Sequence, residues 1–582
     1  MNVDFQVLKD EVEKITVAGD IESILGHDTA YKRFRETAMN RPDSLAIKYM
    51  GKDISFQNLL KDIDSVANVL AGLGIEKNTI VTTSLLCTPS AIVLFYALDK
   101  IGATQHMINC AASPNEIKRE ITHIPSDYFI GNDIFCTPEM MTQLRMTGVK
   151  KIITTSLIDY LEHLINSDSI KFAITEKVKG LKKSEYKKEG VFSYRDLLAN
   201  TSKYSPIEAV DYEENHNATI AYTSGSTGSS KACVATWEGI DSMVQVMGMT
   251  EQGRFQPDDV MLSTFPLWIY YSLLNMIHEP LCLGVTLALD PLFKPERIPK
   301  RNKQYKFNFW LTIPPYLKAF LDSGKRTDCS KWKIVLTGGA ELPNELKRRA
   351  IKYVEDNGGN IEVVQGYGAS ECLGSFAYCY YPNSTEGCLG KPCIGNMLKI
   401  LDVETNEELG VNQSGVGYFY SPALMKEYYG DPEATNHNLV KDANGVTWYN
   451  TEDIIHINDK GEIFLDGRLR RIALALDKDL NPTKIIPERT RRELSMHPAI
   501  NKCEVVTAHD DIYENVAVGF VVLKEGFEAS EDLKKELIDY SKSQVPEYMA
   551  TKEIVFMDDL PVNATGKVDI VKLEKMANNE KI

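Results

Sequence analysis

The chain has 582 residues and a mass of 65.4 kDa, too long for one hydrophobic core, so two or more domains are expected. Hydrophobic residues make up 43% and charged residues 25%, as in ordinary globular proteins. The net charge of −16 argues against a nucleic-acid surface and against binding to acidic membranes. It is compatible with a local cluster of basic residues that binds a phosphorylated substrate.

Strand and helix patterns alternate in the first part of the chain. Residues 45–50 and 52–56 predict a hairpin around Gly51, and residues 59–73 predict an amphipathic helix. The most apolar stretch, 81–103, is interrupted by polar residues, so it predicts a buried strand and a core helix instead of a membrane span. This alternation indicates βα units around a parallel sheet.

A loop dense in hydroxyl groups and glycine follows, between strand patterns at 219–222 and 232–235. Glycines let successive backbone N–H groups converge on an anion, hydroxyls add donors, and Lys231 adds a charge for phosphate oxygens. A β-like run follows Lys231, so this is not a P-loop, and composition alone also fits a flexible connection. The loop residues are Thr223, Ser224, Gly225, Ser226, Thr227 and Gly228.

Further alternation after the loop completes the expected fold. Strands are predicted at 260–265, 285–289, 309–312 and 333–337, and a helix is predicted at 271–283. The fold class is therefore α/β, with a large N-terminal domain of βα layers and parallel sheets, followed by a small α+β domain. We place the boundary so that the domains are 1–469 and 470–582.

Five short motifs follow the loop along the chain. A glycine turn, Thr337 to Pro343, could bring backbone close to a flat ligand. The segment Gln365-Gly366-Tyr367-Gly368-Ala369-Ser370-Glu371 offers an aromatic face and a carboxylate, the ligand type that Mg²⁺ prefers. Asp453 lies in a turn before Gly467-Arg468, and Leu560 to Lys567 ends in Gly-Lys.

Together with the loop, these motifs resemble those of the adenylate-forming superfamily, which includes acyl-CoA synthetases, peptide-synthetase adenylation domains and luciferase-like enzymes. The resemblance covers about Ala30 to Lys575. It implies that the small domain is mobile and that the reaction has two steps. ATP and a carboxylic acid give acyl-AMP and pyrophosphate, and a thiol then displaces AMP.

The resemblance also implies a role for each matching residue. The phosphates of ATP would be bound by Thr223 through Gly228 and by Lys231, and the α-phosphate would contact Ser370. Tyr367 would stack on the adenine, which would be surrounded by Gly339, Ala340, Glu341, Gly366 and Gly368. The ribose would be bound by Asp453 and Arg468. Glu371 and Thr223 would hold Mg²⁺. Lys567 would bridge the carboxylate and α-phosphate during adenylation, so the catalytic residues are Lys567, Glu371 and Thr223.

The chain departs from the family pattern at three places. Ile269 stands where a histidine commonly closes the acyl pocket, so Trp268, Ile269, Tyr270 and Gly338 are the expected substrate residues, with Tyr271 and residues 312–316 setting the pocket volume. Glu452 replaces the glycine of the turn before Asp453, which restricts that turn. Arg470 stands at the hinge, and the family's following glycine loop is missing, which leaves the thiol acceptor open.

Three functions are therefore weighed. The first is an ATP-dependent acid–thiol ligase that uses CoA; the second delivers the acyl group to the phosphopantetheine of a carrier protein; the third is a non-catalytic nucleotide-binding regulator. Retention of Glu371, Asp453 and Lys567 argues against the regulator. The expected ligands are ATP, Mg²⁺, CoA and a small carboxylic acid. No signal peptide pattern is present and eleven cysteines are scattered, so we expect a cytoplasmic protein with reduced thiols.

Overall fold

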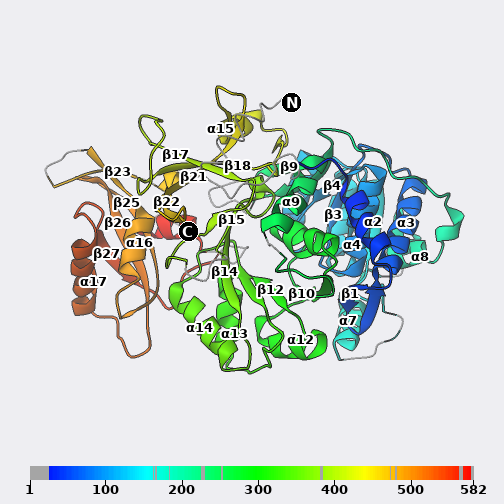
Figure 1. Ribbon diagram of the computed structural model, residues 1–582, viewed down its shortest axis with the longest axis horizontal. Helices are drawn as coiled ribbons and strands as arrows, with labels where there is room; N and C mark the ends of the chain where they lie inside the picture. Colours follow the sequence, from blue (N-terminus) through cyan, green and yellow to red (C-terminus); the bar gives the residue numbers. More distant parts are fainter. Residues whose placement is uncertain are drawn as a thin grey trace. The chain divides into compact units, whose positions relative to one another are not determined.

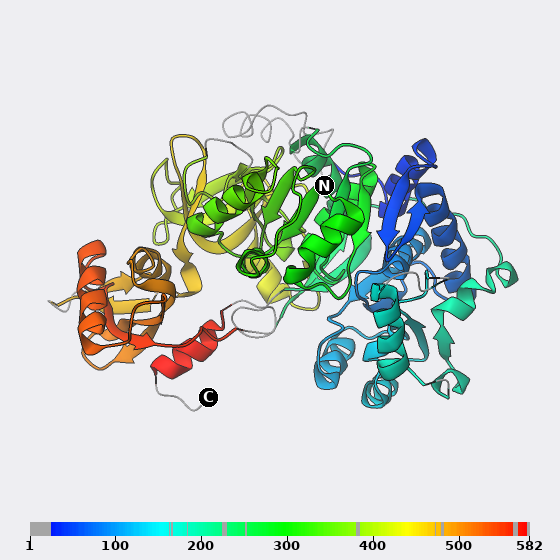
Figure 2. The same cartoon turned by 90° about the horizontal axis from the view of Figure 1, so that it is seen from below.

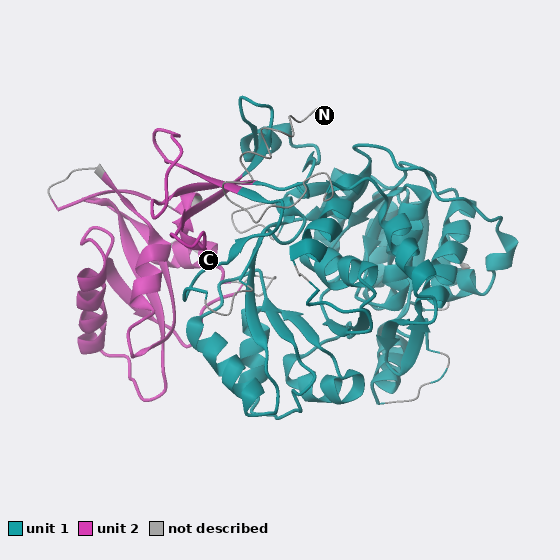
Figure 3. Ribbon diagram, in the orientation of Figure 1, with its two compact units in different colours: residues 1–223, 231–397, 420–449 teal, residues 224–230, 398–419, 450–582 magenta. Residues whose placement is uncertain are grey.

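The computed structural model describes residues 25–161, 163, 167–182, 184–223, 230–250, 253–379, 384–471, 473–478, 482–562 and 568–578. The chain divides into two compact units (Figure 3). Unit 1 comprises residues 1–223, 231–397 and 420–449, and unit 2 comprises residues 224–230, 398–419 and 450–582.

The first sheet of unit 1 carries the hairpin around the predicted phosphate loop. Its strands are ordered β19-β9-β8-β4-β3-β5-β6-β7, and those from β8 to β7 run parallel. At the other end β9 pairs antiparallel with both β8 and β19. The bounds are β3 Ile80–Ser84, β4 Thr104–Met107, β5 Tyr128–Asn132, β6 Lys151–Thr155, β7 Val191–Ser193, β8 Asn217–Tyr222, β9 Ala232–Thr236 and β19 Glu427–Tyr428.

The second sheet of unit 1 is ordered β16-β15-β14-β13-β12-β10-β11-β1-β2 (Figure 1). Its strands from β14 to β1 run parallel, with antiparallel strands at both edges. The bounds are β1 Leu45–Tyr49, β2 Lys52–Ser55, β10 Val260–Ser263, β11 Thr286–Leu289, β12 Phe309–Thr312, β13 Ile334–Thr337, β14 Glu362–Tyr367, β15 Ala377–Tyr378 and β16 Lys391–Pro392. These parallel strands with intervening helices confirm the predicted α/β class.

Helices cover the faces of the two sheets. Helices α12 to α14 pack on one face of the second sheet, where Leu262 meets Leu317 and Leu346 in one apolar cluster (Figures 1 and 2). Helix α4 is buried over its whole length, as the stretch 81–103 predicted. The bounds are α2 Ala30–Asn40, α3 Phe56–Gly72, α4 Pro89–Ile101, α5 Pro114–His123, α6 Pro138–Met146, α7 Ser167–Lys179, α8 Tyr194–Leu198, α9 Trp237–Thr250, α10 Tyr270–Leu273, α11 Glu279–Cys282, α12 Ile298–Tyr305, α13 Pro314–Asp322, α14 Asn344–Glu355 and α15 Pro432–Asn438.

The helix predicted over 271–283 is interrupted. A π-helical turn, Leu274–His278, separates α10 from α11. Pro280 lies in the first turn of α11, where it has no N–H to donate into a continuous α-helix. The segment nevertheless stays in the core, because Leu274, Ile277 and His278 are all buried.

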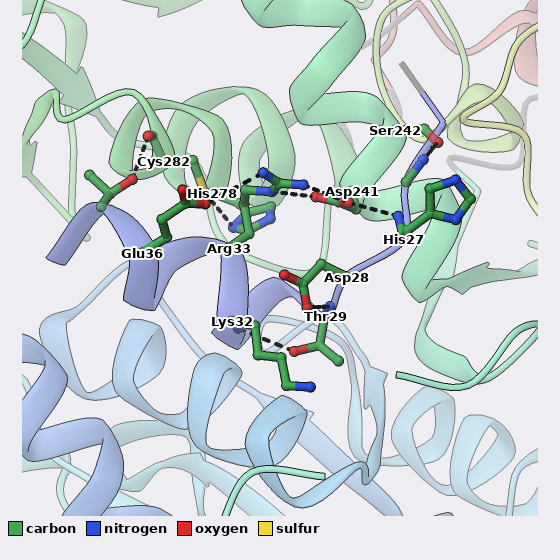
Figure 4. A network of polar contacts seen from close by, with 12 residues as sticks. His27, Asp28, Thr29, Lys32, Arg33, Glu36, Asp241, Ser242, His278 and Cys282 are labelled. Carbon is green, nitrogen blue, oxygen red and sulfur yellow. Dashed lines mark hydrogen bonds and ion pairs between the residues drawn. The ribbon is translucent and has the colours of Figure 1, made fainter. Parts of the chain in front are cut away.

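A polar network ties the start of the described chain to α9 (Figure 4). The Arg33 guanidinium donates to both carboxylate oxygens of Asp241, over 2.7 and 3.0 Å. The same carboxylate accepts from the backbone N–H of His27, and the Ser242 hydroxyl accepts from that of Gly26. Since Asp241 is fully buried, these charge-assisted bonds compensate for its lost hydration.

A further sheet is ordered β17-β18-β21-β20, with β22 beside β21. Unit 2 holds the β23-β24 hairpin and a sheet in which β26 pairs antiparallel with β25 and parallel with β27. Leu494, Val505, Val521 and Leu537 belong to the apolar core of this unit. The bounds are β17 Met397–Leu401, β18 Gly415–Tyr420, β20 Leu439–Lys441, β21 Thr447–Ile457, β22 Ile463–Arg468, β23 Ala473–Leu476, β24 Pro482–Ile485, β25 Ile500–Asp510, β26 Glu514–Leu523, β27 Thr551–Phe556, α16 Pro487–Leu494, α17 Glu531–Gln544 and α18 Ile570–Ala577.

Candidate active site

The predicted phosphate loop connects β8 and β9, as its flanking patterns indicated. Tyr222 pairs with Ala232 in the antiparallel ladder, and the next two residues, Thr223 and Lys231, are hydrogen-bonded to each other. The Thr223 N–H donates to the Lys231 carbonyl over 2.9 Å, and the Lys231 N–H donates to the Thr223 hydroxyl over 3.1 Å. The hairpin therefore fixes both ends of the loop. Ser224, Gly225, Ser226, Thr227 and Gly228 lie outside the described residues.

The side chain of Lys231 has two partners near β19. Its Nζ lies 3.3 Å from Oδ1 of Asn438, a buried residue at the end of α15. The same ammonium lies 4.6 Å from the ring centroid of Tyr428, within the range of a cation–π contact. These contacts hold the charge of Lys231 at the root of the loop.

Tyr428 also contacts the carboxylate of the 365–371 motif. Its hydroxyl donates to Oε1 of Glu371 over 2.5 Å, and Glu371 is only 8% exposed. Strand β19 places Tyr428 opposite Cys233 of β9, next to Lys231. One tyrosine therefore links the cation and the carboxylate that the sequence analysis assigned to ATP phosphates and Mg²⁺.

The thiol of Cys233 lies in this same region but is not suited to nucleophilic chemistry. Burial raises the pKa of Cys233 well above its usual range, and the Glu371 carboxylate raises it further, against the opposing effect of Lys231. A thiol with so high a pKa stays protonated, and the thiolate is the reactive form. Cys233 is thus a packing residue beside the site.

The segment from Gly366 to Glu371 leaves the second sheet in a tight turn. Gly366 and Tyr367 end β14, and Ser370 and Glu371 begin a 3₁₀ turn, Ser370–Cys372. A side chain at Gly368 would place its Cβ 1.9 Å from the carbonyl oxygen of Gly374, so only glycine fits there. Tyr367 is half-buried at this end of the sheet.

The predicted glycine turn follows the neighbouring strand, β13. The N–H of Gly338 donates to the carbonyl of Thr312 over 3.1 Å, and Gly339 has a φ of +75°, in the left-handed region. Gly339, Ala340 and Glu341 are exposed. A Cβ at Gly338 would lie 3.3 Å from the Tyr271 ring, whose buried hydroxyl has no hydrogen-bond partner among the described residues. The turn and this aromatic ring therefore face each other.

The residues predicted to line the acyl pocket separate in the structure. Trp268 is half-buried and Ile269 is 39% exposed. Tyr270 is 2% exposed, and its hydroxyl donates toward the carbonyls of Thr219 and Cys233, under the β8–β9 hairpin. Tyr270 thus packs in the core, while its neighbour Tyr271 contacts the glycine turn.

Unit 2 carries the two residues predicted to bind ribose. Asp453 on β21 pairs with Arg468 on β22, with 3.1 Å between Oδ1 and Nε. Asp453 is 6% exposed. Glu452 has a φ of +57°, in the left-handed region that favours glycine. The structure places Glu452 and Asp453 inside β21 instead of in the predicted turn, and the N–H of Asp453 donates to the Thr451 hydroxyl over 3.0 Å.

The segment after Arg468 is anchored by Arg471. Its guanidinium pairs with Glu488 over 2.5 Å and with Glu504 over 2.9 Å, and also donates to the Val505 carbonyl. Burial raises the pKa of Glu488, and Arg471 opposes that rise. Lys567 lies outside the described residues, between Val562 and Val568, which form an isolated bridge.

Tyr428 and Asn438 were not identified from the sequence. Strand β19 spans two residues, which is too short for a periodic pattern. One available signal was Asp431-Pro432, where Asp431 caps α15 and so places Asn438 at the end of that helix.

Comparison with known proteins identifies relatives over most of the chain. Residues 34–429 match the family model described as AMP-binding enzyme, and residues 493–567 match the AMP-binding enzyme C-terminal domain. The probable CoA ligase CCL5 of Humulus lupulus is 26% identical over 538 residues, 90% of this chain and 88% of that protein. The 4-coumarate–CoA ligase 4 of Arabidopsis thaliana is 26% identical over 91% of this chain and 88% of its own.

Solved structures share the fold. ATP-bound MatB from Rhodopseudomonas palustris has a TM-score of 0.75 and 20% identity, over 94% of this chain and 98% of that chain. The anthranilate CoA ligase AuaEII in complex with anthranoyl-AMP has a TM-score of 0.78 and 18% identity, over 96% of this chain and 99% of that chain. The predicted combination of a large α/β domain and a smaller C-terminal domain is thus confirmed.

Proposed function

Because the chain belongs to the family of AMP-binding enzymes, we propose that it is an ATP-dependent acid–CoA ligase. A carboxylate oxygen attacks the α-phosphorus of ATP and pyrophosphate leaves, which gives acyl-AMP. The CoA thiol then attacks the acyl carbon and releases AMP. Relatives that match about nine tenths of the chain are named CoA ligases, which supports this reaction.

The observation that carries the proposal is the link from Lys231 through Tyr428 to Glu371. ATP brings several negative charges, and this link holds one cation and one carboxylate close together. Lys231 would donate to phosphate oxygens at the root of the hairpin loop. Tyr428 would hold Glu371 in a fixed orientation.

The residues present fit a magnesium ion. Glu371 is a hard oxygen donor, and the Thr223 hydroxyl at the base of the loop is a second one. Mg²⁺ is commonly bound by one or two protein oxygens together with substrate phosphates. Within the described residues there is no cluster of three or more His, Cys, Asp or Glu side chains suited to a metal. When bound, Mg²⁺ would neutralise phosphate charge.

The other predicted residues would complete two binding regions. In unit 1, Tyr367 would stack on adenine beside Gly366 and Gly368, and Ser370 would contact the α-phosphate. The turn from Gly338 to Glu341, together with Tyr271, would lie between the nucleotide and the acyl group. In unit 2, Asp453 and Arg468 would bind ribose. Lys567 would act during adenylation, in a mobile domain of residues 470–582 that follows the domain 1–469.

The acceptor and location need separate tests. A carrier-protein phosphopantetheine would react at the same acyl carbon as CoA, so it remains the second candidate for the thiol. Among the described helices, none has the length and apolar character to cross a bilayer. A cytoplasmic location stays a prediction, since one relative, OPC-8:0-CoA ligase 1 of Arabidopsis thaliana, is named as peroxisomal.

The proposal is tested by pyrophosphate release from ATP across short, medium, long-chain and aromatic acids, with and without CoA. We expect acid-dependent pyrophosphate, and acyl-CoA by mass spectrometry when CoA is present. Glu371→Gln should abolish both products without unfolding the chain, because an amide lacks the carboxylate charge. Acid-dependent pyrophosphate release without formation of acyl-CoA would favour a carrier protein as the thiol acceptor. If no acid gives an acid-dependent product, the proposal is overturned.

A further inference from the structure

Helix α7 presents an apolar row to solvent. Ile170, Ile174 and Val178 are spaced four residues apart, so they lie in line along one face. Their exposed fractions are 46%, 57% and 76%. The opposite face is buried through Phe172 and Ser169, as expected for a surface helix. A continuous row of exposed aliphatic side chains is typical of a surface that contacts another protein or a membrane.

Lysines flank this row. Lys171, Lys177 and Lys179 are all exposed on α7. The two acidic residues of the helix do not offset them on the outward face. Asp168 is buried and pairs with Arg301 and Lys300, over 2.5 and 2.7 Å.

The second acidic residue, Glu176, faces inward. Its Oε1 accepts from the backbone N–H of Leu157 over 2.6 Å. The outward face of α7 therefore combines aliphatic and cationic side chains. This combination is typical of helices that lie in a membrane interface, where lysine stems cover apolar surface and ammonium groups reach the headgroups.

A hollow of about 530 Å³ lies beside the helix. Its lining combines apolar and cationic side chains, with Ile174, Leu292 and Phe293 as apolar members and Lys171, Lys294 and Arg297 as cations. The one acid in the lining is Asp168, whose carboxylate is already paired with Lys300 and Arg301. One exposed acid, Glu296, lies in the adjoining turn. The hollow could receive a phosphorylated headgroup next to the apolar row.

This surface also borders the candidate acyl region. The Phe293 ring lies 5.8 Å from that of Tyr316, and Tyr316 stacks on Phe265 at 5.5 Å. Phe265 precedes the segment expected to line the acyl pocket, and Tyr316 belongs to residues 312–316, which were expected to set its volume. A row of aromatic rings thus connects the hollow with the pocket wall.

We propose that the α7 face, defined by Ile170, Lys171, Ile174, Lys177 and Val178, binds the surface of a bilayer that contains anionic phospholipids. The net charge of −16 argued against such binding, but charges farther apart than about 8 Å are largely screened at physiological ionic strength. The local cations of α7 and residues 294–300 therefore govern contact at this face. Binding needs neither ATP nor an acid, so it is independent of the proposed function.

The test is co-sedimentation of the full chain with vesicles, without nucleotide. Vesicles of phosphatidylcholine alone are compared with vesicles of equal parts phosphatidylcholine and phosphatidylserine. We expect binding to the anionic vesicles only. Lys171→Glu/Lys177→Glu should weaken it by at least about 25-fold, because each cation near such a surface contributes roughly fivefold. Ile170→Ser/Ile174→Ser/Val178→Ser should weaken it by more than about tenfold.

Matched controls alter exposed residues of the same types in unit 2. Val403→Ser/Val411→Ser/Ile512→Ser removes aliphatic residues that are 38%, 47% and 64% exposed, and Lys535→Glu/Lys542→Glu reverses two charges on α17. Both should bind like the unaltered chain. The proposal is overturned if the unaltered chain does not sediment with anionic vesicles, or if the α7 variants bind as well as the controls. A change of mass in sedimentation equilibrium for the α7 variants, without a change in vesicle binding, would assign the face to a second copy.

Discussion

At the residue scale, the candidate site depends on contacts that no single motif contains. Lys231 belongs to the loop after β8, Glu371 to the turn after β14, and Tyr428 to β19. The ring of Tyr428 faces the ammonium and its hydroxyl faces the carboxylate. The aromatic face of Tyr428 and its hydroxyl donor therefore contact different residues, so a substitution can remove the donor and keep the ring.

Tyr428→Phe keeps the ring and removes the donor to Glu371. We expect the Mg²⁺ concentration for half-maximal activity to rise by roughly 10- to 100-fold, the usual effect of losing a partner that orients a metal ligand. The KM for the acid should not change. Calorimetric binding of ATP should show the same shift in Mg²⁺ dependence, a readout that does not require turnover.

Tyr429→Phe is the matched control, because the neighbouring tyrosine points toward His123 instead. It should leave the Mg²⁺ requirement unchanged. If Tyr428→Phe also leaves it unchanged while lowering thermal stability, Tyr428 is a packing residue and the assignment of its hydroxyl is wrong.

At the element scale, the turn before Asp453 shows how the chain tolerates a departure from its family. The sequence indicated that Glu452 restricts a turn built for glycine. In the structure Glu452 has a φ of +57°, in the left-handed region that glycine adopts most easily, although the residue lies within β21. Hydrogen bonds from the Thr451 hydroxyl to the Gly417 carbonyl and from the Asp453 N–H to the Thr451 hydroxyl hold the backbone in this conformation.

Glu452→Gly and Glu452→Ala separate the backbone from the side chain. Both remove the glutamate, but alanine keeps the cost of a left-handed conformation, roughly 1–2 kcal/mol, while glycine does not. Glycine also gains entropy in the unfolded chain, which offsets part of this gain. We expect the glycine variant to exceed the alanine variant in free energy of unfolding by about 1 kcal/mol, measured by hydrogen exchange of β21 amides. Equal protection in the two variants would mean that Glu452 is not strained.

Periodic patterns predicted most strands and helices, because apolar residues that face the core repeat every two residues in a strand and every 3.6 residues in a helix. The hairpin at 45–56, the strands near 219–222, 232–235, 260–265, 285–289, 309–312 and 333–337, and the buried helix α4 followed from such patterns. The two-residue strands β15, β16 and β19 did not. The break between α10 and α11 did not, since π-helical turns have no periodic signal of their own. The side-chain directions of Tyr270 and Tyr271 were equally hidden, because one residue of helical rotation decides which ring meets Gly338.

At the scale of the whole molecule, matches to two family models cover residues 34–429 and 493–567, and so confirm the resemblance drawn from ordered motifs. The order of the motifs along the chain is informative because each motif is expected to bind a different part of the same ligands. The substrate is less predictable, since pocket shape depends on packing between segments distant in sequence. Site residues outside the described ranges, Lys567 among them, stay predictions.

Lys567→Ala tests whether the C-terminal domain acts in only one half-reaction. Adenylation should slow by about 10²–10³-fold, the usual effect of removing one preorganised charge-stabilising group. Transfer from supplied acyl-AMP to CoA should stay near the unaltered rate, because the small domain is expected to have carried Lys567 away from the phosphate before the thiol attacks. Lys572→Ala, an exposed lysine on α18, is the control and should affect neither step. Equal losses in both half-reactions would assign Lys567 a structural role.

The most direct test of the central claim follows a single oxygen atom. An acid that is turned over is labelled with ¹⁸O in its carboxylate, and the products with ATP and CoA are analysed by mass spectrometry. Attack of the carboxylate on the α-phosphorus predicts that one labelled oxygen appears in AMP and none in pyrophosphate. Label in inorganic phosphate, or unlabelled AMP formed together with acyl-CoA, would contradict an acyl-AMP intermediate and with it the function proposed for this chain.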